Sequence, residues 1–368
     1  MKSSELNGLV LPDGLVAPRD VPERVKNELP DGWREAYDFN TLFYDAFYVP
    51  RARAVCLICP ALLNFRDVLK SAEISIDGRP ARIRMIFSQR NYAEVWIGSW
   101  QPAEAMSIVI NGQSFRVPIS HQDNETFLNA NVIMTMCKDG KIEWIVDWLN
   151  YHIKVHRANA VLFFNNNSTA YSKDDLLATL SSIAGLNGSI VIDVPYSYGV
   201  PSVNAMKFLQ KGIWNTARLR FLSRARAVLP IDVDELVSPI VGSDIFSRTT
   251  QSVLGYNLFR GYWRWPHPDA EAGDTRHRDH YFRLSNDDVG RTKYCIAPRG
   301  VLGVSQWGVH QAVAGFMKPL FFADDVIYWH CRNISTNWKY NRSRKASSEL
   351  RSDDEARVAL ERVFSGEI

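Results

Sequence analysis

The stretch NVIMTMCKDGKIEWIVDWLNYHIKVHRANAVLFF, residues 131–164, decides the fold class of this chain. It begins with an apolar run at 131–136 and ends with another at 160–164. Between them, residues 142–155 carry apolar side chains at the spacing that places them on one face of a helix. The stretch therefore predicts a strand, a helix and a second strand, which is the repeating unit of a parallel α/β sheet.

The same alternation continues towards the C-terminus. Residues 173–183 predict a helix that Ser172 can cap, and residues 189–194 predict a third strand. A long helix is expected at 203–223, followed by a fourth strand at 227–231. We therefore expect an α/β domain with a mostly parallel central sheet, whose ligands bind beyond the carboxyl ends of the strands.

The segment before this domain has a different rhythm. Between residues 39 and 122, six short runs rich in β-branched and aromatic residues follow one another, separated in part by Asp-Gly and Asn-Gly turn signals. They predict a small antiparallel β-sandwich domain that precedes the α/β domain. The other expected parts are an N-terminal extension over 1–38, the α/β domain over 123–346 and a charged C-terminal helix over 347–368.

Composition narrows the class of function. The 368 residues carry 43 Lys and Arg against 40 Asp and Glu, so no strong basic field argues for nucleic acid. The five cysteines are irregularly spaced, which favours buried free thiols in a reducing compartment over a zinc site. Neither an apolar leader nor an apolar run of ~20 residues is evident. We expect a soluble cytoplasmic protein, and peripheral contact with the inner face of the membrane stays open.

The fourth predicted strand runs into clustered negative charge. The segment PIDVDELVSP, residues 230–239, places Asp232, Asp234 and Glu235 directly after it. A lone Asp-x-Asp is more often an ordinary turn, because aspartate is common in turns. Here the carboxylates follow a strand of an α/β sheet, where ligand sites gather, and they can face one cation. Carboxylate oxygens favour Mg²⁺ or Mn²⁺, which as a Lewis acid would neutralise a leaving diphosphate.

Several of these segments resemble, in the same order, motifs of glycosyltransferase family 92 and of related capsule-type transferases of the family 2 superfamily. Residues 136–169 are similar to the start of that catalytic region, with its "EWL.YH" helix and its "DN.S" loop. The residues that match are Glu143, Trp148, Leu149, Tyr151, His152, Asn166 and Ser168. Asn165 departs from the pattern, since the family has Asp at that position.

The resemblance covers about residues 43–340. Residues 231–239 are close to the family's "DxDEF..P" segment, with Leu in place of Phe. Residues 293–310 resemble its "K.i..P..v….H" pattern, and residues 328–332 its "l.HYR" pattern. The segment FYDAFYVPRARAVCLI, residues 43–58, looks like the strand that opens the family's preceding β-domain.

The resemblance implies a GT-A fold, that is, an α/β sheet that binds a nucleotide sugar, with a DxD metal site and an acceptor half. It places Asp234 as principal ligand of Mn²⁺ or Mg²⁺, and Glu235 as the residue that supports the site. The residues that it places at the metal are Asp232, Asp234, His310 and His330. The residues that it places at the donor nucleotide are Lys138, Asp139, Asn165, Asn166, Asp232, Lys293 and Arg332. Taken singly, a histidine is more often structural and a basic residue more often a solvated charge.

The resemblance further implies inversion at the anomeric carbon, which needs a carboxylate to take the proton of the acceptor hydroxyl. The available carboxylates are Asp279, Asp324 and Asp325, and the sequence does not choose among them. The tryptophans that can stack on an acceptor sugar, and that fit a core position equally well, are Trp263, Trp265 and Trp307.

The resulting hypothesis is a metal-dependent glycosyltransferase with a nucleotide-sugar donor, UDP-linked as a first guess, and a glycan or glycolipid acceptor, without nucleic acid. One alternative is a non-catalytic carbohydrate- or nucleotide-binding protein with a degenerate domain, which Asn165 favours slightly. Another is a metal-dependent phosphohydrolase or nucleotidyltransferase. That class would want further carboxylates or histidines at recognisable spacing, and none is evident in the sequence.

Overall fold

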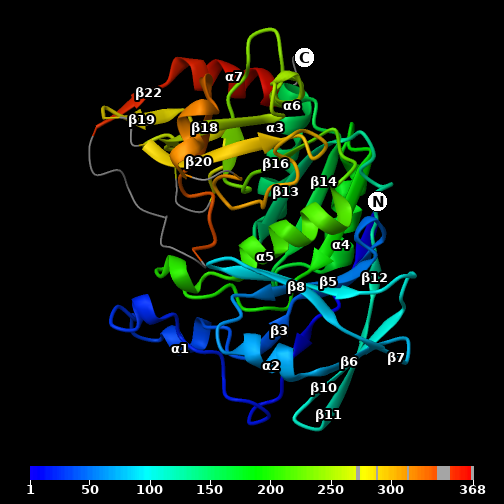
Figure 1. Ribbon diagram of the computed structural model, residues 1–368. Coiled ribbons are helices and arrows are strands. Elements are labelled where there is room, and N and C mark those ends of the chain that lie inside the picture. The colour runs from blue at the N-terminus through cyan, green and yellow to red at the C-terminus, as the bar shows by residue number, and fades with distance from the viewer. Residues whose placement is uncertain (271–273, 287–288, 313–314, 338–348, 366–368) are drawn as a thin grey trace. The chain divides into compact units, whose positions relative to one another are not determined.

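The computed structural model describes residues 1–270, 274–286, 289–312, 315–337 and 349–365 (Figure 1). The chain divides into two compact units. We call residues 1–4, 125–193 and 223–368 the α/β unit. Residues 5–124 and 194–222 form the β-rich unit, which therefore holds segments on both sides of the predicted 39–122 domain. No helix in the described part of the chain is long and apolar enough to cross a membrane.

The α/β unit is built on a nine-stranded sheet with the order β1-β15-β14-β13-β16-β20-β18-β21-β17. Its first five strands are parallel: β1 (Lys2–Ser4), β15 (Gly188–Asp193), β14 (Ala160–Asn165), β13 (Asn131–Cys137) and β16 (Ala227–Pro230). The other four pair in mixed directions: β20 (Val289–Ile296), β18 (Tyr256–Arg264), β21 (Phe322–Cys331) and β17 (Glu235–Val237). The expected mixed α/β architecture with a large central sheet is confirmed, and the predicted strands lie in its parallel half.

The helices of this unit bury apolar side chains in the same hydrophobic cluster as the sheet. They are α3 (Ile142–His156), α4 (Lys173–Ser182), α6 (Ile245–Gln251) and α7 (Asp354–Phe364). In α3, Ile145, Trp148 and Leu149 are fully buried and belong to the same hydrophobic cluster as Ile133 and Phe163 of the sheet. The helix follows from its sequence, because apolar residues three and four apart lie on one face.

The C-terminal helix is shorter than the predicted 347–368. Asp353 caps α7 by accepting a hydrogen bond from the backbone N–H of Ala356 at 3.1 Å. The preceding residues Leu350–Ser352 form β22, which pairs with β19 (Phe282–Leu284). Residues 347, 348 and 366–368 lie outside the described ranges.

The predicted long helix at 203–223 is wrong in its extent. A 3₁₀ turn at Asn204–Met206 is followed by α5 (Leu209–Thr216) and a π-helical turn at Ala217–Phe221. The side-chain amide of Asn91 donates to the carbonyls of Asn204 and Lys207 at 2.7 and 3.0 Å. These two carbonyls bond a distant side chain, so the first part of the segment does not continue a helical ladder.

The β-rich unit contains two larger sheets that share one hydrophobic cluster. Val55, Leu57 and Val95 enter this cluster from the first sheet, and Met106 and Ile108 enter it from the second. The first sheet contains β12 (Ser120–His121), β4 (Asp45–Val49), β5 (Ala54–Pro60), β9 (Tyr92–Gly98) and β8 (Ile83–Ser88). The second contains β11 (Gln113–Pro118), β10 (Ala105–Ile110), β6 (Glu73–Ile76) and β7 (Arg79–Ala81). A β-sandwich assignment for this region stays a prediction.

Candidate functional site

The acidic segment forms a tight turn between β16 and β17. The backbone N–H of Asp232 donates to Glu235 Oε2 at 3.0 Å, and the N–H of Glu235 donates to the carbonyl of Asp232 at 3.1 Å. The side chain of Glu235 thus closes the turn to which it belongs. It fixes where the carboxylates of Asp232 and Asp234 leave the backbone.

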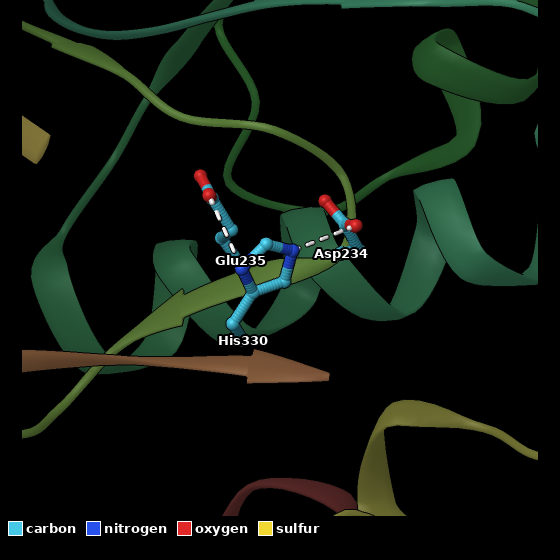
Figure 2. Close-up of side chains that lie close together, drawn as sticks. All are labelled: Asp234, Glu235 and His330. Atoms are coloured by element: carbon cyan, nitrogen blue, oxygen red, sulfur yellow. Dashed lines mark hydrogen bonds and ion pairs between the residues drawn. The ribbon is translucent and has the colours of Figure 1, made fainter. Parts of the chain in front are cut away.

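The pairing of β17 with β21 brings a histidine to this turn. Glu235 and His330 are register partners in that antiparallel pair. His330 Nε2 lies 3.0 Å from Asp234 Oδ2, and its Nδ1 lies 3.9 Å from Glu235 Oε1. Figure 2 shows the imidazole between the two carboxylates. We call Asp234, Glu235 and His330 the acidic triad.

The acidic triad has the composition of a divalent-cation site. Each residue offers one ligand atom, and these atoms lie within 4.8 Å of one another. All three side chains are buried. Two carboxylates and one imidazole suit Mn²⁺ and similar divalent ions. In the described ranges no other group of His, Cys, Asp or Glu has this geometry.

Lys293 of β20 is the buried counter-charge of the turn. Its Nζ lies 2.7 Å from Asp232 Oδ2 and 2.8 Å from Glu235 Oε2, and the side chain is 2% exposed. Burial alone would lower the pKa of Lys293, but the two carboxylates outweigh burial and raise that pKa. Burial raises the pKa of Glu235, and Lys293 opposes that rise. The predicted donor residues Asp232 and Lys293 thus form one ion-paired network with Glu235.

An aromatic and cationic stack extends from His330. Its ring stacks on Trp263 of β18 with centroids 3.8 Å apart, because the two residues are register partners in the β18–β21 pair. The guanidinium of Arg332 lies 4.0 Å from the centroid of Trp263 and 5.0 Å from that of Trp265. Of the three predicted acceptor tryptophans, Trp263 therefore adjoins the triad. Trp265 is buried beside Arg332, and Trp307 is fully buried in the core.

His310 lies outside the acidic triad. Its Nδ1 lies 3.2 Å from the carbonyl of Thr292, and the hydroxyl of Thr292 donates to the carbonyl of His310 at 2.8 Å. This pair of bonds holds His310 beside the residue that precedes Lys293 in β20. The predicted metal ligands therefore do not all come together. Asp234 and His330 belong to the triad, and Asp232 is bonded to Lys293. His310 lies beside Thr292, the residue that precedes Lys293.

The predicted nucleoside residues gather at the carboxyl ends of β13, β14 and β15. Asn165 Nδ2 donates to Asp193 Oδ1 at 2.9 Å, and these residues are register partners at the ends of their strands. The N–H of Asn166 donates to the carbonyl of Cys137 at 2.9 Å. The carboxylate of Asp139 accepts from the N–H of Ala170 at 2.9 Å. These residues therefore lie beyond the carboxyl ends of the parallel strands, where α/β proteins bind ligands.

Lys138 precedes Asp139 in the loop that follows β13. Its carbonyl accepts from the hydroxyl of Thr336 at 3.1 Å. The loop is thereby tied to a segment that follows β21.

The three carboxylates predicted as catalytic bases lie apart from the triad. Asp324 and Asp325 are exposed near the start of β21, and Asp325 pairs with Arg248 at 2.6 Å. Asp324 and His330 are six positions apart along the strand, which is about 20 Å when the strand is extended. Asp279 accepts from the N–H of Arg276 at 2.7 Å in a short helical turn. None of the three has a hydrogen bond or ion pair to the triad among the described residues.

Three residues that the sequence analysis did not single out, Asp147, Arg276 and the buried His277, support the acidic turn. His277 Nε2 lies 2.8 Å from the carbonyl of Val233, between the two aspartates. Arg276, the neighbour of His277, donates to Asp147 of α3 at 2.7 and 2.5 Å. This bonding anchors α3 to the segment that holds the acidic turn.

Helix α3 also fixes β17 directly. The hydroxyl of Tyr151 donates to the carbonyl of Val237 at 2.8 Å, and His156 Nε2 lies 2.9 Å from the same oxygen. Burial lowers the pKa of His152 to about 3 and that of His156 to about 4, so both imidazoles are neutral at pH 7. The signal in the sequence is the presence of Asp147, His152 and His156 on the otherwise apolar face of the helix.

The comparisons with known proteins give glycosyltransferases at low similarity. No family model and no curated protein matches the chain. The apo structure of the bifunctional glycosyltransferase WbbM is 11% identical over 46% of this chain and 26% of that chain, with a TM-score of 0.26. The mannosyltransferase Ktr4p from S. cerevisiae, solved with GDP, is 10% identical over 39% of this chain and 42% of that chain, with a TM-score of 0.26.

GalNAc-T7, solved with UDP, GalNAc and Mn²⁺, is 11% identical over 67% of this chain and 50% of that chain, with a TM-score of 0.32. The chain thus spans half or less of the length of these three structures. Similarities with TM-scores of 0.32 or less carry no argument about the activity of this chain.

Proposed function

We propose that this chain is a metal-dependent, inverting glycosyltransferase that moves a sugar from a nucleotide-sugar donor to a glycan or glycolipid acceptor. The observation that carries the proposal is the acidic triad, formed where the segment PIDVDEL meets β21. Both segments belong to the motif series that resembles glycosyltransferase family 92. The triad thus joins two motifs that lie almost a hundred residues apart in the chain.

The charges around the acidic turn favour a divalent cation. Asp232, Asp234 and Glu235 supply three negative charges, and Lys293 supplies one positive charge that is bonded to Asp232 and Glu235. His330 Nε2 lies 3.0 Å from Asp234, so three carboxylates gather around one lysine and one histidine in a largely buried site, where a divalent cation would stabilise the clustered negative charge. Asp234, His330 and Glu235 would hold Mn²⁺ or Mg²⁺, and a bound ion would neutralise the diphosphate of the donor.

The protein's own residues have separate roles in this proposal. Lys293 holds the carboxylates of Asp232 and Glu235 in place through its ion pairs, while Trp263 and Arg332 fix the orientation of the His330 ring. Arg332 also adds positive charge next to the expected diphosphate position. Asn165, Asn166, Lys138 and Asp139 line the sheet edge where the nucleoside would lie. The carboxylate that accepts the acceptor's proton is not assigned.

A panel assay tests the proposal. The protein is incubated with nucleotide sugars, UDP-linked ones first, in Mn²⁺ or in EDTA, and release of free nucleotide is measured with and without glycan acceptors. We expect Mn²⁺-dependent release with at least one donor, and Asp234→Asn should remove it. Absence of donor turnover and of any metal effect would refute the transferase assignment.

A second candidate, a carbohydrate- or nucleotide-binding protein without catalysis, rests on Asn165. Its amide stands where the family has Asp, and it is bonded to Asp193. This candidate predicts Mn²⁺-dependent binding of a nucleotide sugar without release of nucleotide. The same panel, read once by calorimetry and once by product release, separates the two functions.

A further inference from the structure

A separate pocket lies within the β-rich unit, which contains none of the triad residues. It has a volume of about 530 Å³. Its walls are formed by residues 22–24, by residues 61–63 and 66 before and at the start of α2 (Phe65–Ser71), and by residues 88–90 at and after the end of β8. A neighbouring pocket of about 450 Å³ shares Arg90 with it. Volumes of this size accommodate small organic ligands.

Three arginines line the pocket without carboxylate partners. Arg24, Arg66 and Arg90 all contribute to its walls, and none of them forms an ion pair in the described ranges. Burial and then the charge of Arg90 lower the pKa of Arg24, so the two guanidiniums lie close enough to repel each other. The one acidic residue in the wall, Glu23, is paired with Lys26. Cations gathered in this way favour an anionic ligand.

A fourth cation adds to this charge. Lys211 of α5 lies 3.5 Å from the side chain of Gln89, and burial and then Arg90 lower its pKa. Glu28 is the one acidic residue in the wall of the neighbouring pocket. The net charge of the residues around Arg90 is therefore positive.

The sequence of the two strand regions explains the excess charge. No acidic residue occurs between Asp45 and Asp67, nor between Asp77 and Glu94. These two intervals contain seven arginines: Arg51, Arg53, Arg66, Arg79, Arg82, Arg84 and Arg90. Arg66 and Arg90 of the pocket come from these intervals, and neither forms an ion pair with a carboxylate among the described residues.

The pocket wall is a fixed structure. Leu63 has a left-handed backbone conformation with φ of 50°, which is costly for a residue with a branched side chain. The adjacent Asn64 side chain bonds the N–H of Asp20 at 2.9 Å and the carbonyl of Pro18 at 3.0 Å. Arg66 Nη1 donates to Ser88 Oγ at 3.0 Å, which ties α2 to the end of β8. The arginines are thus presented on a wall that several bonds hold in place.

We propose that this pocket binds the phosphate monoester of a small molecule or lipid through Arg24, Arg66 and Arg90. Guanidinium groups bind phosphate oxygens through paired N–H donors. A phosphate monoester carries about two negative charges at pH 7, which suits several arginines better than a single carboxylate does. The apolar walls at Ala61, Leu62 and Leu63 would contact the organic part of the ligand.

Calorimetry on the full-length protein tests this proposal with three probes: inorganic phosphate, glucose 1-phosphate, and vesicles of phosphatidylcholine with or without phosphatidic acid. The test variants are Arg24→Gln and Arg90→Gln. The matched control is Arg116→Gln, which removes the same charge from an exposed position of β11. We expect binding of a phosphate probe by the wild type and by the control, and a loss of about tenfold or more in affinity in each test variant.

The arms of the experiment separate the sources of the phosphate. Binding of glucose 1-phosphate but not of vesicles indicates a soluble ligand, and binding confined to phosphatidic acid vesicles indicates a lipid headgroup. The proposal is overturned if no probe binds, or if Arg116→Gln weakens binding as much as the test variants do. Either failure leaves the glycosyltransferase assignment intact, because nucleotide release depends on the triad in the other unit.

Discussion

Glu235 and His330 are register partners across the β17–β21 pair, and the imidazole Nδ1 lies 3.9 Å from the glutamate Oε1. The same glutamate accepts a hydrogen bond from the backbone N–H of Asp232, which closes the acidic turn. It also forms an ion pair with the ammonium group of Lys293. One side chain therefore links the turn, the buried lysine and the histidine. Its position makes the triad dependent on strand pairing as well as on the local sequence.

Asp234→Asn should remove metal-dependent activity with little change of shape. The amide keeps the size of the carboxylate but loses its charge, so Mn²⁺ affinity should fall, and nucleotide release should fall roughly 100-fold or more. Calorimetric Mn²⁺ titration and the release assay check both effects. Asp354→Asn serves as the control, because Asp354 is exposed on α7 and has no assigned role in the site. Equal loss in the two variants would remove Asp234 from its assigned role.

Lys293→Met should destabilise the fold in the absence of metal. The substitution leaves the buried carboxylate of Glu235 and the half-buried one of Asp232 without their shared cation, and breaking a buried ion pair typically costs about 3–5 kcal/mol. Urea unfolding with and without Mn²⁺ measures this cost, and the ion should restore part of the lost stability. Arg248→Met breaks the exposed pair with Asp325 and should cost about 1 kcal/mol or less. A Lys293 variant as stable as the wild type would contradict the buried-network account.

Stability should fall as the pH drops below about 6.5. Burial lowers the pKa of His152 to about 3, and those of His156 and His280 to about 4, so the unfolded chain takes up protons before the native state does. The stabilisation is complete above the unfolded pKa and is lost as the pH falls from about 6.5 towards 4. The loss should approach roughly 3 kcal/mol per histidine at the acid limit.

Urea midpoints measured from pH 7.5 to pH 4.5 check this slope. His156→Gln retains hydrogen-bonding capacity but does not titrate, so its curve should be flatter than that of the wild type. His121→Gln is the control, since His121 is exposed. A slope that is the same in all three proteins would show that other groups control the acid sensitivity.

Trp263→Ala and Trp307→Ala should have different effects, because Trp263 adjoins the acidic triad and Trp307 lies in the hydrophobic core. Trp307 is fully buried, and its truncation should cost about 3–5 kcal/mol of stability. Trp263 is partly exposed and stacked on His330, so its truncation should affect donor turnover and Mn²⁺ affinity more than stability. Thermal unfolding and the release assay, applied to both variants, give the comparison. The reverse pattern would place the functional ring at Trp307.

Four of the five parallel strands could be predicted from the sequence because their signals are local, whereas β1 (Lys2–Ser4), a polar segment within the expected extension 1–38, could not. Buried parallel strands appear as apolar runs, as at 131–136 and 160–164, and the helix between them has a clear apolar face. The start of the predicted 203–223 helix could not be placed, because carbonyls in its first part bond Asn91, more than a hundred residues away. A local sequence pattern carries no information about a contact between residues so far apart.

The sequence predicts that the acidic segment binds a cation, but it does not predict which hydrogen bonds and ion pairs the carboxylates form. Clustered carboxylates after a strand point to a cation from composition and position alone. Whether Lys293 or a metal ion meets a given carboxylate depends on the pairing of β20, β18 and β21, which no local pattern specifies. The supporting residues Asp147, His152 and His156 show why polar residues on an apolar helix face merit functional attention.

The placement of His330 has a consequence for biosynthesis. Asp234 and His330 are 96 positions apart, and β21 is inserted between β18 and β17, two strands made much earlier. During synthesis on the ribosome the carboxylates of the turn are made before the strand that completes their cation site. The site therefore forms late, through a contact between residues far apart in the sequence. A product that ends before residue 322 carries all three acidic residues of the turn but lacks the strand that would hold them.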